Sequence, residues 1–87
     1  MKSEKVTLVN ELGLHMRPAS EMAQMASGMD CDVKINYNDK EYDAKSVMML
    51  MSACLKKGYE VEVKADGPDE EKAVSQIVEF IASGLGD

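Results

Sequence analysis

The sequence has few of the residues that build metal sites and disulfide frameworks. It contains one histidine and two cysteines in 87 residues, and the cysteines, Cys31 and Cys54, lie in different segments. This leaves no metal-ligand spacing, and a secreted domain of this size would more often carry several disulfide bonds. We therefore expect no bound metal, packing roles for both thiols and a reducing compartment, the cytoplasm.

Long apolar runs and an excess of basic residues are also missing. No apolar stretch approaches about 18 residues, and the N-terminus shows no signal-peptide pattern, so we expect no membrane insertion. Ten Lys and Arg residues stand against 16 Asp and Glu residues, which gives a formal net charge of −6. Direct binding to nucleic acid or to an anionic lipid surface favours the opposite sign. Proteins with positive patches are the expected partners.

Length and hydrophobic patterning predict one domain over residues 1–87, without repeats or linkers. We expect strands over Lys2–Val9, Cys31–Tyr37, Lys40–Ala44 and Tyr59–Ala65, with an Asn38-Asp39 turn between the second and third. Helices are expected over the segment of Ala19, Met22, Ala23 and Ala26, after Ser46, and along the stripe of Val74, Ile77, Val78, Ile81 and Leu85. The order β-α-β-β-α-β-α predicts an α+β open-faced sandwich, with three helices on one face of a four-stranded sheet.

Capping signals mark the ends of these helices. Gly28 is expected to end the first helix, and Ser46 to cap the start of the second. Lys56 and Lys57 suit the C-terminus of the second helix, with Gly58 as its left-handed exit. Acidic residues in segment 66–71 suit the first turn of the third helix.

The only histidine lies in the string Gly13-Leu14-His15-Met16-Arg17-Pro18-Ala19-Ser20. Imidazole is nucleophilic and partly neutral near pH 7, and the Arg17 guanidinium is well shaped to hold phosphate or carboxylate. Because Pro18 is tolerated in the first turn of a helix, the string predicts a loop that ends at a helix N-terminus, which is an anion site. The alternative is a lone histidine that only decorates the surface or satisfies a hydrogen bond.

This string resembles HPr, the histidine-containing phosphocarrier family of the bacterial phosphoenolpyruvate-dependent sugar phosphotransferase system. Lys45-Ser46-Val47-Met48, Lys56-Lys57-Gly58 and Ala65-Asp66-Gly67 carry the resemblance over essentially the whole chain. It implies an antiparallel sheet, a phosphoryl acceptor at His15 (through Nδ1), and Arg17 as the electrostatic partner of that histidine. It also implies a covalent relay without a cofactor, rather than a turnover enzyme.

The resemblance implies partners as well. Phosphorylated Enzyme I would be the donor, and sugar-specific IIA domains the acceptors. Ser46 would be a regulatory site for an ATP-dependent HPr kinase/phosphorylase, with a catabolite-control transcription regulator as a further partner. Without the resemblance, Ser46 is an ordinary helix N-cap. We expect a monomer, because a relay presents one face to successive partners.

Methionine is abundant, with eight residues. Those in the short second helix either fill the core or form an adaptable docking patch. Docking is expected at Val47, Met48 and Met51, the best exposed candidates there, with Met16 and Ser20 on the first helix. Leu12, Met16, Met49 and Cys54 depart from the residues common in the family, and so bear on partner choice.

Other hypotheses stay open at this point. An acyl carrier protein is also small and acidic, but it would need a serine after aspartate and a four-helix bundle. A regulatory relative would bind partners without carrying phosphate on histidine, and a related branch serves nitrogen signalling. In a purely structural domain, the His-Arg-Pro arrangement would be chance.

Overall fold

The computed structural model, which describes residues 1–86, contains a four-stranded sheet and three α-helices. In chain order the elements are β1 (Lys2–Thr7), α1 (Met16–Ser27), β2 (Asp32–Tyr37), β3 (Lys40–Asp43), α2 (Val47–Ser52), β4 (Glu60–Asp66) and α3 (Glu70–Ala82). The strands lie in the order β1-β4-β2-β3, and every neighbouring pair is antiparallel. The predicted sandwich and its β-α-β-β-α-β-α order are confirmed.

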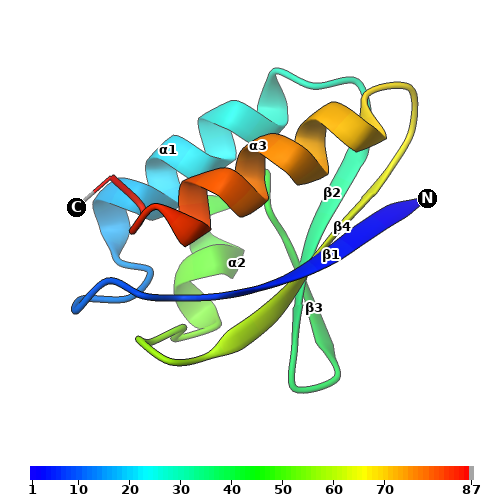
Figure 1. Cartoon of the computed structure of the whole chain (residues 1–87). Helices are drawn as coiled ribbons and strands as arrows, with labels where there is room; N and C mark the ends of the chain where they lie inside the picture. The colour runs from blue at the N-terminus through cyan, green and yellow to red at the C-terminus, as the bar shows by residue number, and fades with distance from the viewer. Residues whose placement is uncertain (87) are drawn as a thin grey trace.

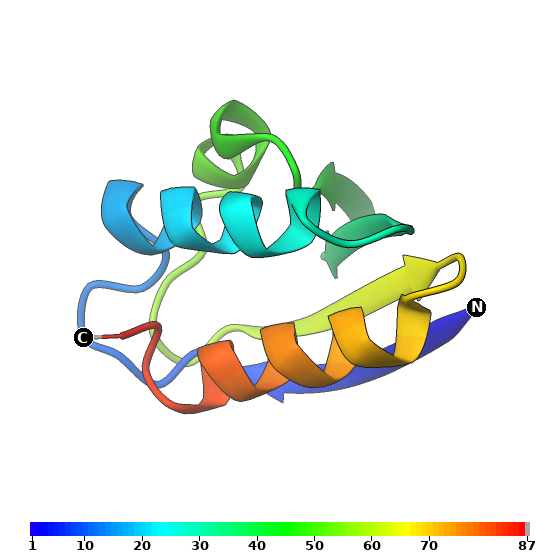
Figure 2. The same ribbon diagram turned by 90° about the horizontal axis from the view of Figure 1, so that it is seen from above.

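The helices form one layer and the sheet forms the other (Figures 1 and 2). Helix α3 packs across β1 and β4, and α1 lies beside α3. The short helix α2 packs against α1 and β3. The start of α1 lies at the same end of the molecule as the C-terminal segment, whereas the N-terminus lies at the opposite end.

The core lies between these two layers. The sheet contributes the inward-facing side chains of Val33, Ile35, Val61, Val63 and Ala65. The helices contribute the buried residues Pro18, Ala19, Met22, Ala23 and Ala26 of α1, Leu50 of α2, and Ala73, Val74, Ile77 and Ile81 of α3. These are the faces that the two-residue and helical periodicities predict, and their burial is the main source of stability.

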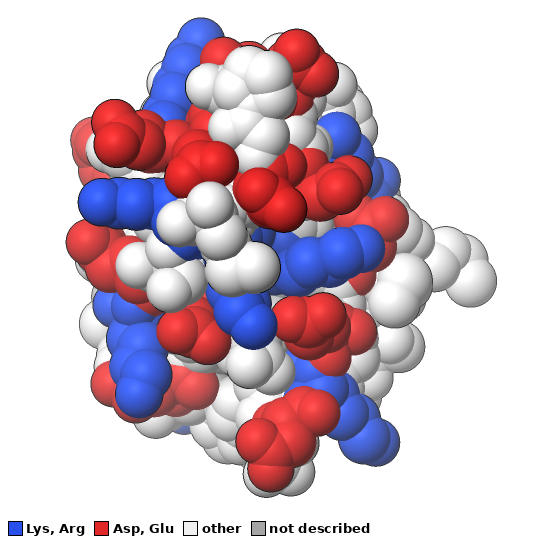
Figure 3. Space-filling view, turned by 90° about the vertical axis from the view of Figure 1, so that its right-hand side faces the viewer, with Lys and Arg blue, Asp and Glu red and all other residues white. Residues whose placement is uncertain are grey.

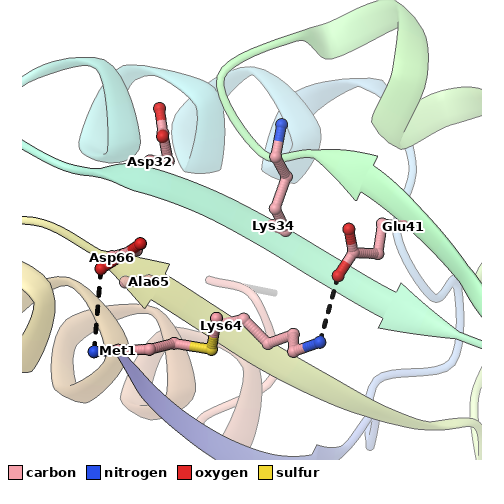
Figure 4. Close-up of a pocket in the computed structure, with 7 residues that line it drawn as sticks. All are labelled: Met1, Asp32, Lys34, Glu41, Lys64, Ala65 and Asp66. Carbon is pink, nitrogen blue, oxygen red and sulfur yellow. Dashed lines mark hydrogen bonds and ion pairs between the residues drawn. The ribbon is translucent and has the colours of Figure 1, made fainter.

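The other face of the sheet is charged. Figure 4 shows a hollow on it, lined by Met1, Asp32, Lys34, Glu41, Lys64, Ala65 and Asp66. Lys64 Nζ lies 3.1 Å from Glu41 Oε2 in this hollow. On the neighbouring side of the molecule, Figure 3 shows acidic and basic side chains interspersed, with no broad field of one sign. Neither His15 nor Arg17 lines the hollow.

Strand ends differ slightly from the predicted ones. Strand β1 ends at Thr7 rather than at Val9, although Leu8 N–H still donates to Tyr59 O (3.0 Å). Strand β2 begins, and β3 ends, one residue inside the predicted bounds. Strand ends are often ambiguous by one or two residues, because a single hydrogen bond decides them.

The prediction that Lys56 and Lys57 end the second helix is wrong. Helix α2 ends at Ser52, without a basic residue in its last turn. Helical geometry cannot continue past Cys54, which has a left-handed φ of 52°, and the next residue, Leu55, is buried. Lys57 instead forms an ion pair with Glu11, which lowers the pKa of that carboxyl.

The two cysteines have different surroundings. Cys31 is buried, and burial raises the pKa of its thiol, which suits an inert packing residue. Cys54 is exposed on a left-handed turn (φ 52°), so its predicted packing role is wrong.

Among residues 1–86, no group of three or more His, Cys, Asp or Glu side chains is arranged to hold a metal ion. No helix in the same range is long and apolar enough to cross a membrane.

Glu70 links the start of α3 to the loop before it. Its Oε1 accepts a hydrogen bond from Gly67 N–H (3.3 Å). This hydrogen bond and the nearby Met1 amino group lower the pKa of the Glu70 carboxyl. The stability that this carboxylate contributes is present above the unfolded-state pKa and is lost as the pH falls through the folded-state pKa.

We expect Glu70→Gln to weaken the loss of stability at low pH, seen when the free energy of unfolding from denaturant titration is plotted against pH. Glu79→Gln, at an exposed position on the same helix, should leave that loss unchanged; equal curves for wild type and Glu70→Gln would contradict the prediction.

Candidate functional site

The loop before α1 is fixed to the loop after α2. Buried Asn10 donates through Nδ2 to Gly13 O (2.8 Å), and Leu14 N–H donates to Leu55 O (3.0 Å). Gly13 has a left-handed φ of 63°, and a Cβ on it would lie 2.4 Å from Leu55 O. Only glycine lets the two loops approach this closely. The loop residues that directly precede His15 are therefore held firmly in place.

His15 is the N-cap residue of α1. Its backbone is extended (φ −107°, ψ −174°), and its side chain makes no capping hydrogen bond to the helix. Leu14 before it and Pro18 and Ala19 after it are buried, whereas His15 itself is partly exposed. These neighbours hold the imidazole at the surface, where another protein could reach it.

The first turn of α1 is electrostatically positive. The amides of Met16 and Arg17 open the helix, where no preceding turn supplies carbonyl acceptors. Pro18 has no N–H, and Ala19 N–H donates to His15 O (3.0 Å). The first turn contains no acidic residue, so the helix dipole and the Arg17 guanidinium reinforce one another. This arrangement suits an anion carried on His15.

Arg17 is paired with a carboxylate one turn further along α1. Its Nη1 lies 3.1 Å from Glu21 Oε1, and both side chains are close to half exposed. Gly86 approaches the same pair: a Cβ there would lie 3.3 Å from Arg17 Nη1 and 3.4 Å from Glu21 Oε2. The preceding residue, Leu85, is fully buried and anchors the C-terminal segment beside the pair.

Ser46 is the N-cap of α2, as its sequence position predicts. Its Oγ accepts a hydrogen bond from Met49 N–H (3.3 Å), and the residue is partly exposed. This hydrogen bond satisfies one of the unpaired donors at the start of a short helix. Ser46 therefore has a structural role whether or not it is modified.

We expect Ser46→Ala to lower the free energy of unfolding by about 1 kcal/mol, because the cap of α2 is lost. Ser46→Asp should retain most of the stability, since aspartate is an equally good N-cap. Urea denaturation of the three proteins measures both effects. Equal midpoints for wild type and Ser46→Ala would show that the Met49 hydrogen bond contributes nothing.

Only part of the predicted docking face is freely exposed. Met48 is 82 % exposed and Met16 is 60 % exposed, while Ser20 is partly exposed. The prediction that Val47 and Met51 are among the best exposed residues is wrong, because both pack against the core beside Leu50. Their i, i+3, i+4 spacing with Leu50 places them on the inward side of α2. Met49, at 41 %, is the second outward methionine of this helix.

Sequence reasoning missed three groups near the site: Glu21, buried Asn10, and the segment of Leu85 and Gly86. Glu21 could have been found, because it lies four residues after Arg17 on a predicted helix face. The contact of Gly86 with Arg17 joins residues far apart in the chain, and no local pattern marks it.

Comparisons with known proteins agree with this fold and show its family. Residues 2–83 match the family model PTS-HPr, described as the PTS HPr component phosphorylation site. The chain is 34 % identical to the phosphocarrier protein HPr of Cupriavidus necator, over all of this chain and 98 % of that protein. A crystal structure of HPr-C-His from Thermoanaerobacter tengcongensis superposes with a TM-score of 0.94 at 36 % identity, covering 100 % of this chain and 98 % of that one. A crystal structure of an HPr dimer from the same organism gives 0.78 at 36 % identity, with both chains fully covered.

An open-faced sandwich with a partly exposed histidine at the start of α1 is the architecture of a histidine phosphocarrier. The chain belongs to the PTS HPr family. Its members are phosphocarrier proteins of the phosphotransferase system, which carry a phosphoryl group and do not turn over a substrate. The four-stranded sheet rules out the four-helix bundle of an acyl carrier protein.

Proposed function

We propose that His15 accepts a phosphoryl group from phosphorylated Enzyme I and passes it to sugar-specific IIA domains, with Arg17 as its electrostatic partner. The observation that carries this proposal is the partly exposed imidazole at the start of α1, followed by a first turn with a guanidinium and no acid. The Lys45-Ser46-Val47-Met48 segment favours the sugar system over the related nitrogen-signalling branch.

The site suits both halves of a relay. In the first half, the Nδ1 lone pair of neutral His15 forms a bond to phosphorus. The bond between phosphorus and the donor atom breaks, and its electron pair returns to the donor while Nε2 keeps its proton. The transfer uses the lone pair of the neutral ring, and the partly exposed position of His15 leaves the imidazole within reach of a donor protein.

In the second half, the bound phosphoryl dianion is stabilised by the first-turn N–H groups and the guanidinium. A phosphoryl group on nitrogen remains reactive, so the acceptor can attack phosphorus and return the electron pair to Nδ1. No metal or nucleotide takes part in either half of this proposal.

Regulation and docking form the second part of the proposal. Partners contact Met16, Ser20 and Met48, with Val47 and Met51 at the edge of the contact. Ser46 is the substrate of the HPr kinase/phosphorylase, and the modified form binds a catabolite-control transcription regulator. A phosphate at Ser46 would sit at the positive end of α2, so it adds charge near the docking face without unfolding the helix.

We further propose that the protein acts in the cytoplasm as a monomer. The Thermoanaerobacter tengcongensis relative has been crystallised as an HPr dimer, so the monomer needs a direct test. Light scattering at the protein concentration used for the transfer assay provides it.

Intact-mass spectrometry after incubation with Enzyme I and phosphoenolpyruvate tests the carrier function. We expect one acid-labile phosphoryl addition, which then moves to an added IIA domain. A folded protein that accepts no phosphoryl group from several Enzyme I sources would refute the carrier role. Addition without onward transfer to any IIA domain would refute the sugar-uptake part alone.

A further inference from the structure

In the structure the Arg17 guanidinium is paired with an acidic side chain, and the proposed cycle offers the same guanidinium another anion. Glu21 Oε1 lies 3.1 Å from Arg17 Nη1 in the unphosphorylated protein. The proposed second anion is the phosphoryl group on His15, two residues before Arg17 and at the positive end of the same helix. We propose that Glu21 is a positioning residue that competes with this phosphoryl group for Arg17. The inference rests on the proposed function and adds a residue to it.

The position of Glu21 argues for competition. Arg17 lies in the first turn of α1, where the helix dipole disfavours a cation. Glu21 is the only acidic residue of α1, and it stands one turn after Arg17 rather than in the first turn. It therefore holds the guanidinium from the side of the helix that leads away from the N-terminus. When the N-terminal end of α1 gains a dianion, the same guanidinium has a stronger partner there.

The strength of the pair suits exchange. Arg17 and Glu21 are 47 % and 44 % exposed, so water and salt screen their attraction. The order of the pair, with the cation before the acid, is also the less favourable one on a helix. Such a pair is strong enough to favour one position of the guanidinium, and weak enough for a phosphoryl group to replace Glu21 as its partner.

Competition has a defined consequence for the carrier. Each phosphorylation must break or weaken the contact between Arg17 and Glu21, which makes the phosphorylated state less stable than Arg17 alone would make it. Glu21 thus raises the tendency of phosphorylated His15 to give its phosphoryl group away. Removing the carboxylate should shift the phosphoryl group toward this protein in any equilibrium with another carrier.

A direct competition measures this shift. Unlabelled Glu21→Gln and ¹⁵N-labelled wild type are mixed in equal amounts with limiting phosphoenolpyruvate and a catalytic amount of Enzyme I, which exchanges phosphoryl groups between them. Intact mass then gives the phosphorylated fraction of each. We expect the variant to be favoured roughly 1.5- to fivefold, the range spanned by exposed ion pairs. The preference should shrink in about 1 M salt.

Two variants separate competition from simpler effects. Glu4→Gln removes an exposed carboxylate from β1 and should leave the partition equal, which controls for net charge. In an Arg17→Ala background, Glu21→Gln should no longer change the partition, because Glu21 acts through Arg17. The same shift in that background would assign the effect to direct repulsion and overturn the proposal, as would an equal partition with Arg17 present. Absence of any phosphoryl addition would instead refute the proposed function.

Discussion

His15→Ala should accept no phosphoryl group from Enzyme I, whereas the wild-type protein gains one. The side chain supplies the only imidazole of the chain, and neither the helix N–H groups nor the guanidinium of Arg17 can form the bond to phosphorus. The expected change is a complete loss of the acid-labile addition in intact-mass spectra. This is the largest functional effect expected of any single substitution.

The folded state should survive this substitution. His15 is partly exposed and its side chain makes no capping hydrogen bond to α1, so we expect a change in unfolding free energy within about 1 kcal/mol. Circular dichroism and urea denaturation check this. Arg17→Ala is the companion variant, which should slow acceptance while leaving the acceptor atom in place. Phosphorylation of folded His15→Ala at another residue would contradict the proposed acceptor.

Gly13→Ala should cause the largest loss of stability among substitutions near the site, roughly 2–4 kcal/mol. Two penalties combine at this position. An alanine at φ 63° is strained by about 1 kcal/mol, and its Cβ would lie 2.4 Å from Leu55 O and 2.8 Å from Lys56 Cα. The loops of residues 10–14 and 55–58 must then move apart, which also breaks the hydrogen bond from Leu14 to Leu55.

Gly58→Ala is a matched control for the backbone strain alone. Gly58 also has a left-handed φ, 90°, but a Cβ there would meet nothing within 4 Å. We expect it to cost about 1 kcal/mol, and thermal or urea denaturation of both variants gives the comparison. If the two substitutions cost the same, the close approach of the two loops does not matter for stability.

The fold could be predicted from the sequence because its local signals agree with each other. Alternation in segment 31–37 and the stripe of Val74, Ile77, Val78 and Ile81 give the inward faces of β2 and α3 correctly. Leu85, the last residue of the predicted stripe, is buried but lies beyond the end of α3 at Ala82, because the chain leaves the helix there and Leu85 has a left-handed φ of 57°. The Asn38-Asp39 pair also forms the expected turn, and the structure adds that both residues are left-handed, with φ values of 55° and 65°. The end of α2 could not be predicted in this way, because the chain leaves the helix through a left-handed residue, Cys54, that is not one of the residue types favouring this conformation.

The site was predictable to the extent that it is local in sequence. The string from Gly13 to Ser20 and the cap at Ser46 lie where the sequence places them. The exposure of Val47 and Met51 was not predictable from a six-residue helix, because it depends on which side of α2 meets α1 and β3. The approach of Gly86 to Arg17 is a tertiary contact, so only the folded chain reveals it.

The division of α2 into a buried side and an outward methionine pair bears on how one small protein can meet several partners. Leu50 fixes the backbone of the helix, while Met48 and Met49 extend unbranched thioether chains into solvent. Partners of different shape should therefore find the same backbone and different methionine rotamers. Recognition would then be adjusted by rotation about side-chain bonds, at little energetic cost, while the scaffold that carries His15 stays still.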